Sequence, residues 1–187
     1  RLPKSNHRKL NIIRIGTSGA LQEDIPVDSF VLSTDGLGFD GLLGFYDVDY
    51  REEEKNLAKA FLQQTPWPFA ANSPYFVKGS NFLKEKLGDG MHKGITATAN
   101  GFYGPQGRSL RLGAKVPNLN EYLNRFEYKG NKITNFEMET SALYGLCALL
   151  GHEAGTVCAI IANRFSKSYS KDYKKTVDQL IELTLHR

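Results

Sequence analysis

A group of side chains able to hold an oxyanion follows the first apolar run of the sequence. Residues 10–15 (LNIIRI) are rich in β-branched side chains, which predicts a strand, and the Gly-Thr-Ser-Gly that follows predicts a tight turn. Thr17 and Ser18 add hydroxyl donors to the free backbone N–H groups of such a turn, and Arg14 adds a guanidinium. These donors suit a phosphate-like anion. A plain tight turn with Arg14 in a salt bridge fits the same residues, and the sequence does not decide between the two.

Residues 102–108 (FYGPQGR) combine aromatic side chains with one glutamine and one arginine. Gln106 carries a donor and an acceptor whereas Arg108 carries donors alone, so the pair suits a planar heterocycle whose edge alternates carbonyl and N–H groups. An aromatic ring such as that of Phe102 can stack on such a base. The glycine and proline between them are also typical of a surface turn, which is the simpler interpretation of this segment taken alone.

Two carboxylates, Glu137 and Glu139, lie near the start of the clearest apolar helix pattern, residues 134–150. Thr134 and Glu137 have the spacing of a capping box, which offers Glu137 a purely structural role. Glu139 lies on the same predicted face as apolar residues, where a carboxylate needs polar partners. The two hydroxyls of a sugar diol would supply such partners.

Several other motifs are not assigned any chemistry. Residues 36–41 match GxGxxG, but no helical pattern follows them, so a flexible glycine loop is the better interpretation than a dinucleotide site. The four histidines have no metal-ligand spacing, and the sequence contains neither HExxH nor GxSxG, so we expect no metal. Cys147 and Cys158 lie in apolar segments without a CxxC motif, which is typical of buried thiols in a reducing compartment.

The composition is that of an ordinary globular domain. The 187 residues include 24 Lys+Arg and 20 Asp+Glu, a formal net charge of +4, with 41% apolar residues. These values exclude a disordered, collagen-like or disulfide-stapled chain. Basic residues cluster near both ends among polar ones, so we expect solvated segments and no nucleic-acid surface. Because no apolar run approaches roughly 18 residues and no signal peptide opens the chain, we expect a cytoplasmic protein with no membrane partner.

Alternating strand and helix patterns predict an α/β domain. The run GTVCAIIA (155–162) is apolar throughout, as in a strand covered on both faces. This order favours a single domain with a mostly parallel sheet and helices on its faces. The expected strands are 10–15, 27–34, 93–99 and 155–162, and the expected helices are 52–64, 118–126, 134–150 and 171–185, with a glycine-rich irregular segment at 35–49.

Four segments occur in the order and at the spacing of a known enzyme family. RIGTSGA (14–20), FYGPQGR (102–108), NFEMET (135–140) and IIANR (160–164) together resemble the nucleoside phosphorylase superfamily. The Gln-x-Arg element resembles the uracil-binding element of its uridine phosphorylase branch. The resemblance covers nearly the whole chain and implies an α/β three-layer sandwich with a central mixed, mostly parallel sheet and helices on both faces.

The resemblance also implies a role for each matched residue. Arg14 and Thr17 would bind phosphate, with Gly16 giving it access to the backbone, and Thr17 would also approach the ribose. The ribose would be held by Glu137, Met138 and Glu139, and the base by Phe102, Gln106, Arg108, Ile161, Ala162 and Arg164.

The chain departs from the family pattern at three places. The turn before the glutamine has Gly104-Pro105 where relatives often carry a different pair. Purine-specific relatives carry an Asp shortly after the last strand, where this chain has residues 162–164 (Ala-Asn-Arg), which favours a pyrimidine base. Relatives also begin with a Gly-Asp-Pro-x-Arg-type phosphate motif, and a neighbouring subunit adds an Arg and a His. None of these is in residues 1–187, so we expect a single nucleoside phosphorylase-like domain lacking its N-terminal portion.

The implied reaction is the reversible phosphorolysis of a pyrimidine nucleoside, in which uridine and phosphate give uracil and ribose 1-phosphate. Arg14, Thr17, Arg108 and Glu139 would be its catalytic residues. Phosphate is a co-substrate and no cofactor is expected, while the family implies a homo-oligomer with shared active sites. We expect little or no phosphorolysis from these 187 residues alone.

Other functions remain open at this point. A hydrolytic nucleosidase of the same superfamily is the nearest alternative, although it has no use for an oxyanion clamp at Arg14. A non-catalytic nucleoside-binding module and a basic RNA-binding protein are more distant ones. The sequence does not decide between uridine, thymidine and deoxyuridine.

Overall fold

Strands and helices alternate along the chain in the computed structural model, which describes residues 6–68 and 72–187. The strands are β1 (Asn11–Ala20), β2 (Phe30–Gly38), β3 (Tyr75–Lys78), β4 (His92–Thr98), β5 (Glu127–Tyr128), β6 (Asn131–Glu137), β7 (Glu153–Asn163) and β8 (Ser168–Tyr169). The helices are α1 (Glu52–Gln64), α2 (Asn81–Leu87), α3 (Leu119–Arg125), α4 (Thr140–Leu149) and α5 (Tyr173–Leu185), with 3₁₀ turns η1 (Leu42–Phe45) and η2 (Gly104–Gln106).

Within the described residues, five strands of the sheet close into a ring. β1 pairs with β6 and β7, β2 pairs with β4 and β7, and β4 pairs with β6, so the ladder returns to the strand from which it started. The two longest ladders, β1–β7 and β2–β4, are parallel, whereas β1–β6 and β2–β7 are antiparallel. The sheet is therefore mixed, and its central strands are hydrogen-bonded on both sides.

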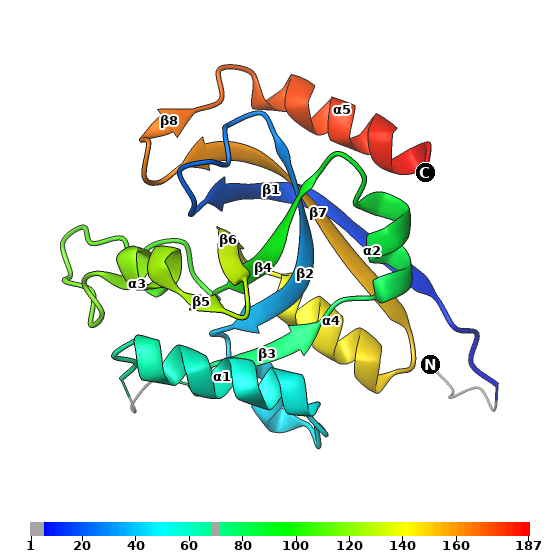
Figure 1. The fold of residues 1–187 in the computed structure, drawn as a ribbon, viewed down its shortest axis with the longest axis horizontal. Helices are drawn as coiled ribbons and strands as arrows, with labels where there is room; N and C mark the ends of the chain where they lie inside the picture. The colour runs from blue at the N-terminus through cyan, green and yellow to red at the C-terminus, as the bar shows by residue number, and fades with distance from the viewer. Residues whose placement is uncertain (1–5, 69–71) are drawn as a thin grey trace.

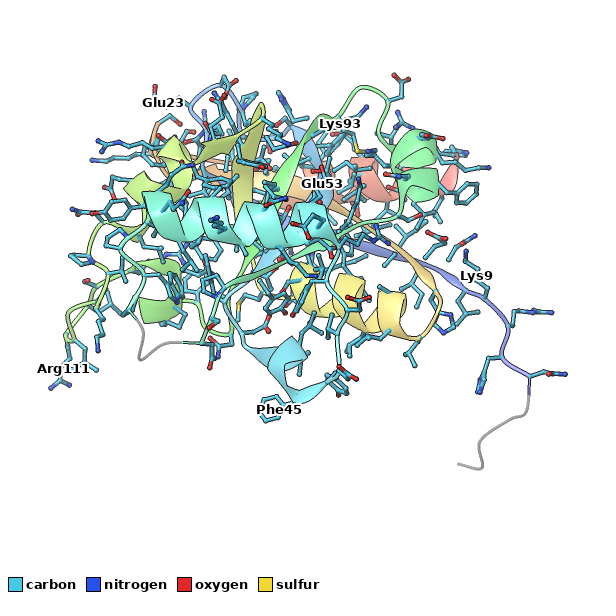
Figure 2. The ribbon with its side chains drawn as sticks, turned by 60° about the horizontal axis from the view of Figure 1, so that its bottom comes forward. Lys9, Glu23, Phe45, Glu53, Lys93 and Arg111 are labelled. Atoms are coloured by element: carbon cyan, nitrogen blue, oxygen red, sulfur yellow. The ribbon has the colours of Figure 1, made fainter. Side chains whose placement is uncertain are left out.

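Helices lie on both sides of this sheet, which confirms the predicted fold class. Figure 1 shows α5 along one side and α1 and α4 along the other, with α3 at one end beside β5 and β6. Side chains at the periphery point outward: Figure 2 shows Phe45 projecting from η1 and Arg111 lying at the far end of the segment between η2 and α3. No helix in the described part of the chain has the length and apolar content needed to cross a membrane.

Helix α1 lies within the bounds that the sequence predicts. Its first turn carries three glutamates, which the positive end of the helix dipole favours, and Glu54 accepts a hydrogen bond from the Arg51 backbone N–H at 2.8 Å. The predicted inner face, Leu57, Ala60 and Phe61, is buried. The prolines that follow the helix cannot continue its hydrogen-bonding pattern.

The predicted helix over 134–150 is wrong in its first part. Residues 131–137 form strand β6, and α4 begins only at Thr140. Thr134 and Glu137 therefore do not form a capping box. Residues 133 and 135–137 pair with β4, and Thr134 Oγ1 donates to the Ile95 carbonyl at 3.2 Å, so cross-strand bonds replace the local helix. The predicted end is correct, because Gly151 has a φ of +73°, which a glycine adopts without strain.

Two glycine segments that the sequence predicts as turns or loops belong to strands. Residues 16–19 continue β1 to Ala20, because their pairing with β7 persists through an irregularity between Ser18 and Gly19. Gly36 and Gly38 continue β2, where they pair with β3 and β4. Small residues are needed at these positions for close packing rather than for chain reversal, a distinction that the residue types alone do not reveal.

Phe61 lies at the centre of the main core. It is fully buried, and its ring centroid is 5.8 Å from that of Phe39, 6.2 Å from that of Phe76 and 5.7 Å from that of Phe126. The helix α1 is thereby fixed to the sheet by aromatic contacts.

We expect Phe61→Ala to lower the free energy of unfolding by about 3–5 kcal/mol, because a large buried ring is replaced by a cavity. Urea unfolding measures the change. Leu62→Ala on the same helix, at a side chain that is 49% exposed, is the control and should cost less than about 1 kcal/mol. Equal losses in the two variants would contradict the assignment of Phe61 to the core.

Candidate active site

One cavity of about 410 Å³ contains the predicted site residues. It lies where the ends of β1, β6 and β7 meet the segment around η2. Among the residues predicted for the site, only Gly16 does not line it. The lining residues are Arg14, Thr17, Ser18, Gly19, Phe102, Gln106, Arg108, Phe136, Glu137, Met138, Glu139, Ile161, Ala162, Arg164 and Tyr169.

Arg14 is held between two carboxylates. Its Nη2 lies 3.3 Å from Glu137 Oε2 and donates a short hydrogen bond to Glu139 Oε2, while Nη1 donates to Cys158 Sγ at 3.3 Å. Burial opposes the charged guanidinium, but the neighbouring Cys158 and carboxylates outweigh burial and raise the pKa of Arg14. Arg14 therefore stays charged, and because Cys158 is protonated at neutral pH, the two carboxylates account for its anionic surroundings.

Gly16 makes room for this arrangement. A Cβ added at Gly16 would lie 2.5 Å from Arg14 Nη1, so the guanidinium lies over the glycine. The space that the sequence analysis assigned to phosphate access is occupied here by Arg14 itself. The phosphate role of Gly16 stays a prediction.

Glu137 is buried, and its carboxylate oxygens all have partners. Oε1 accepts from Thr98 Oγ1 at 2.6 Å, and Oε2 accepts from the Glu139 N–H at 2.9 Å and faces Arg14. The Thr140 N–H lies 3.1 and 3.0 Å from the two oxygens. Such partners offset the cost of burying a carboxylate. Glu137 is therefore built to orient its neighbours, and it has little acceptor capacity left for a sugar hydroxyl.

Glu139 differs from its predicted setting on a buried apolar face. It is the N-cap residue of α4, and its side chain is 58% exposed. Its carboxylate lines the cavity and contacts Arg14. The predicted apolar face was an artefact of extending the helix back to residue 134. The open carboxylate is still suited to accept hydrogen bonds from a ligand's hydroxyl groups.

The other end of the cavity is cationic. Gln106 is 2% exposed, and its Oε1 accepts from Arg108 Nη1 at 2.8 Å and from Arg164 Nη2. The guanidinium of Arg108 also lies 3.9 Å from the centroid of the Phe102 ring. With Oε1 held by two arginines, the Nε2 of Gln106 and the free N–H groups of Arg108 are the polar groups available to a ligand.

Arg164 is a half-buried cation that positions Gln106. Its Nη1 donates to the Gln106 carbonyl at 3.0 Å and to Asn120 Oδ1 at 3.2 Å, and its guanidinium lies 4.9 Å from the Phe136 ring centroid. Burial and the nearby charge of Arg108 lower the pKa of Arg164 to about 9. Even so, it remains protonated at neutral pH. The described residues provide it with no carboxylate partner.

Comparison with known proteins decides the family. The pattern of the phosphorylase superfamily matches residues 8–185. The chain belongs to the phosphorylase superfamily. This match covers all four of the segments on which the resemblance rests.

Individual members of the phosphorylase superfamily are similar at modest identity. A uridine phosphorylase of Thermococcus kodakarensis is 32% identical over 170 residues, which cover 87% of this chain and 52% of that protein. A DeoD-type purine nucleoside phosphorylase of Colwellia psychrerythraea is 28% identical over 177 residues, 93% of this chain and 62% of that protein. The chain thus spans about half to two-thirds of the length of these relatives.

A solved structure gives the same result for the fold. The crystal structure of a Trypanosoma brucei nucleoside phosphorylase, described as showing uridine phosphorylase activity, superposes with a TM-score of 0.84 at 26% identity. The match covers 94% of this chain and 62% of that one.

Two residues of this phosphorylase-superfamily cavity, Phe136 and Tyr169, were missed in the sequence, whereas Ser18 and Gly19 belong to the segment already proposed to hold an oxyanion. Gly19 and Phe136 are adjacent to Arg164, since a Cβ at Gly19 would lie 3.2 Å from Arg164 Nε and the ring of Phe136 lies under the guanidinium. Phe136 lies within the matched segment 135–140, which was a usable signal. Tyr169 lines the cavity because β8 pairs with β7, and no motif in the sequence indicated this pairing.

We expect Cys158 to resist alkylation in the folded protein. Burial raises the pKa of its thiol to about 11, more than the neighbouring Arg14 lowers it, so the reactive thiolate is scarce at pH 8. Mass spectrometry of the Cys158 peptide after iodoacetamide treatment measures labelling, with protein in guanidinium chloride as the control. Labelling of the folded protein at the rate of the denatured control would contradict this expectation.

Proposed function

We propose that the protein catalyses the reversible phosphorolysis of a pyrimidine nucleoside, converting uridine and phosphate to uracil and ribose 1-phosphate. The observation that carries the proposal is the convergence in one cavity of an arginine with Thr17, an open carboxylate at Glu139, and the Gln106–Arg108 pair. These groups match the three parts of the reactants: an oxyanion, a sugar diol and a base edge bearing carbonyl oxygens.

The polar ends of the cavity suit the movement of charge in this reaction. As the bond between the anomeric carbon and the base nitrogen breaks, its electron pair moves to the base, and the sugar becomes cationic. Gln106 Nε2 and Arg108 would donate to the base oxygens on which negative charge develops. A phosphate oxygen held by Arg14 and Thr17 then forms the new bond to the anomeric carbon, while Glu139 orients the ribose through its hydroxyls.

The base end supports a pyrimidine over a purine. Phosphorolysis of a purine is assisted by an acid that protonates the leaving base, and no acidic residue is among the described residues that line this end. Instead, Arg164 lies there and fixes Gln106. Relatives named uridine phosphorylase in Thermococcus kodakarensis and Escherichia coli support the same choice. Phosphate is the co-substrate, and we propose no further cofactor.

We also propose a homo-oligomer with shared active sites, in which a neighbouring copy completes the phosphate site. The proposal rests on the resemblance described above. Light scattering of the full natural protein tests it, and a monomer with full activity would overturn it.

The decisive assay measures uracil release from uridine by the full natural protein that contains these residues. We expect release that requires phosphate, together with formation of ribose 1-phosphate. Release that is independent of phosphate would indicate a hydrolytic nucleosidase. Uridine binding without release of uracil would indicate a binding module, and either outcome would overturn the proposal.

We expect Arg108→Ala to lower kcat/KM for uridine about a hundredfold, because the loss of a charged donor to the developing base anion costs about 3 kcal/mol. The KM for phosphate should change less than about twofold, since Arg108 lies at the opposite end of the cavity from Arg14. Steady-state kinetics with each substrate varied separates the two.

Arg111→Ala is the matched control for this variant. Arg111 lies three residues further along the same segment but does not line the candidate active site. Its removal should leave both constants near their original values. If Arg108→Ala behaved like Arg111→Ala, Arg108 would have no part in binding the base.

A further inference from the structure

The glycine motif at residues 36–41 has a structural role that its resemblance to a nucleotide loop conceals. A Cβ added at Gly36 would lie 2.8 Å from Ser141 Cα, and one added at Gly38 would lie 2.2 Å from Tyr75 Cζ. The two glycines therefore let the first turn of α4 and the ring of Tyr75 pack directly on β2. This is the helix that begins at the carboxylates of the candidate active site.

Asp40, two residues further on, binds both of the elements that the glycines admit. Its Oδ2 accepts from Ser141 Oγ at 2.8 Å, and its Oδ1 accepts from the Tyr75 hydroxyl at 2.8 Å and from the Leu42 N–H at 2.7 Å. A single carboxylate thus joins the end of β2, strand β3 and the first turn of α4.

Thr98 connects this cluster to the cavity. Its hydroxyl is fully buried, accepts from the Ser141 N–H at 3.1 Å and donates to Glu137 Oε1 at 2.6 Å. A backbone N–H can only donate and a carboxylate can only accept, so the single proton of the Thr98 hydroxyl points to Glu137. Glu137 in turn faces Arg14 through its other oxygen.

We propose that Thr98 and Asp40 are positioning residues that hold Glu137, and through it Arg14, in the geometry needed to bind phosphate. The proposal rests on the proposed function insofar as Arg14 is the phosphate ligand. Without the Thr98 hydroxyl, Glu137 Oε1 keeps only the Thr140 N–H, at 3.1 Å. The carboxylate then turns toward Arg14 and competes with phosphate for the guanidinium.

The test compares Thr98→Val with Thr98→Ser in the full natural protein. Valine keeps the shape of threonine and removes the hydroxyl, whereas serine keeps the hydroxyl. We expect Thr98→Val to raise the dissociation constant of inorganic phosphate about tenfold, the usual effect of losing a hydrogen bond to a charged group. Thr98→Ser should restore it to within about threefold, and the dissociation constant of uracil should stay within about twofold in both.

A structural role alone would give a different pattern. If Thr98→Val weakened phosphate and uracil binding equally, or if serine failed to rescue phosphate binding, the positioning role would be wrong. Should Thr98→Val not fold, Asp40→Asn tests the same connection from a half-buried position. It should weaken phosphate binding about threefold with uracil binding unchanged, and an unaltered phosphate affinity would overturn the proposal.

Arg14→Lys separates this inference from the proposed function. A lysine lacks the guanidinium fork, so phosphate affinity should fall if Arg14 is the phosphate ligand. If Arg14→Lys has no effect, the phosphate assignment in the proposed function fails. If Arg14→Lys weakens binding but Thr98→Val does not, the phosphate assignment stands and the positioning inference fails. The NMR signal of the Arg14 side-chain Nε–H provides a readout independent of activity: it should move in Thr98→Val and return in Thr98→Ser.

Discussion

The carboxylate of Glu137 is the group whose requirements organise the site. Removing a carboxylate from water costs several kcal/mol unless hydrogen bonds and an opposite charge replace the lost hydration. Glu137 is 4% exposed, and its partners come from three elements: Thr98 at the end of β4, the first backbone N–H groups of α4, and Arg14 on β1. Satisfying one buried charge therefore brings β1, β4, β6 and α4 together at one place.

The position of β6 between β4 and β1 makes this convergence possible. β6 is bonded to β4 on one side and to β1 on the other, so side chains at its end reach residues from both neighbours. β7 pairs with β1 over ten residue partners and carries Ile161 and Ala162 to the same cavity. The antiparallel pairing of β2 with β7 closes the ring on its other side. The ring adds β2, whose glycines admit the first turn of α4.

Local patterns in the sequence predicted the elements whose stability is local. The glutamates and the apolar face of helix α1 lie within the helix, and prolines come shortly after it, so the local sequence was enough to predict its bounds. Strand β6 was not predicted, because Thr134 and Glu137 have the spacing of a capping box. Pairing with β4, nearly forty residues earlier in the sequence, overrides that local preference. The same reason explains the glycines of β1 and β2, whose neighbours are set by long-range pairing. The site residues were found through motif order, while Tyr169, which depends on β8, carried no motif.

The distribution of charge in the cavity links the fold to the proposed reaction. The carboxylates of Glu137 and Glu139 lie at one end with Arg14, whereas Arg108 and Arg164 lie at the other with no carboxylate among the described lining residues there. Arg14 offsets part of the negative charge at its own end. In the proposed reaction positive charge develops on the sugar, toward the carboxylates, and negative charge develops on the base, toward Arg108 and Arg164. The fixed groups therefore favour both changes. Because these groups are already in place before any ligand arrives, little reorganisation is needed as the bond breaks. Arg164 is central to this arrangement, since it packs on Phe136 and its hydrogen bonds keep Gln106 oriented without an anion that would cancel the positive field.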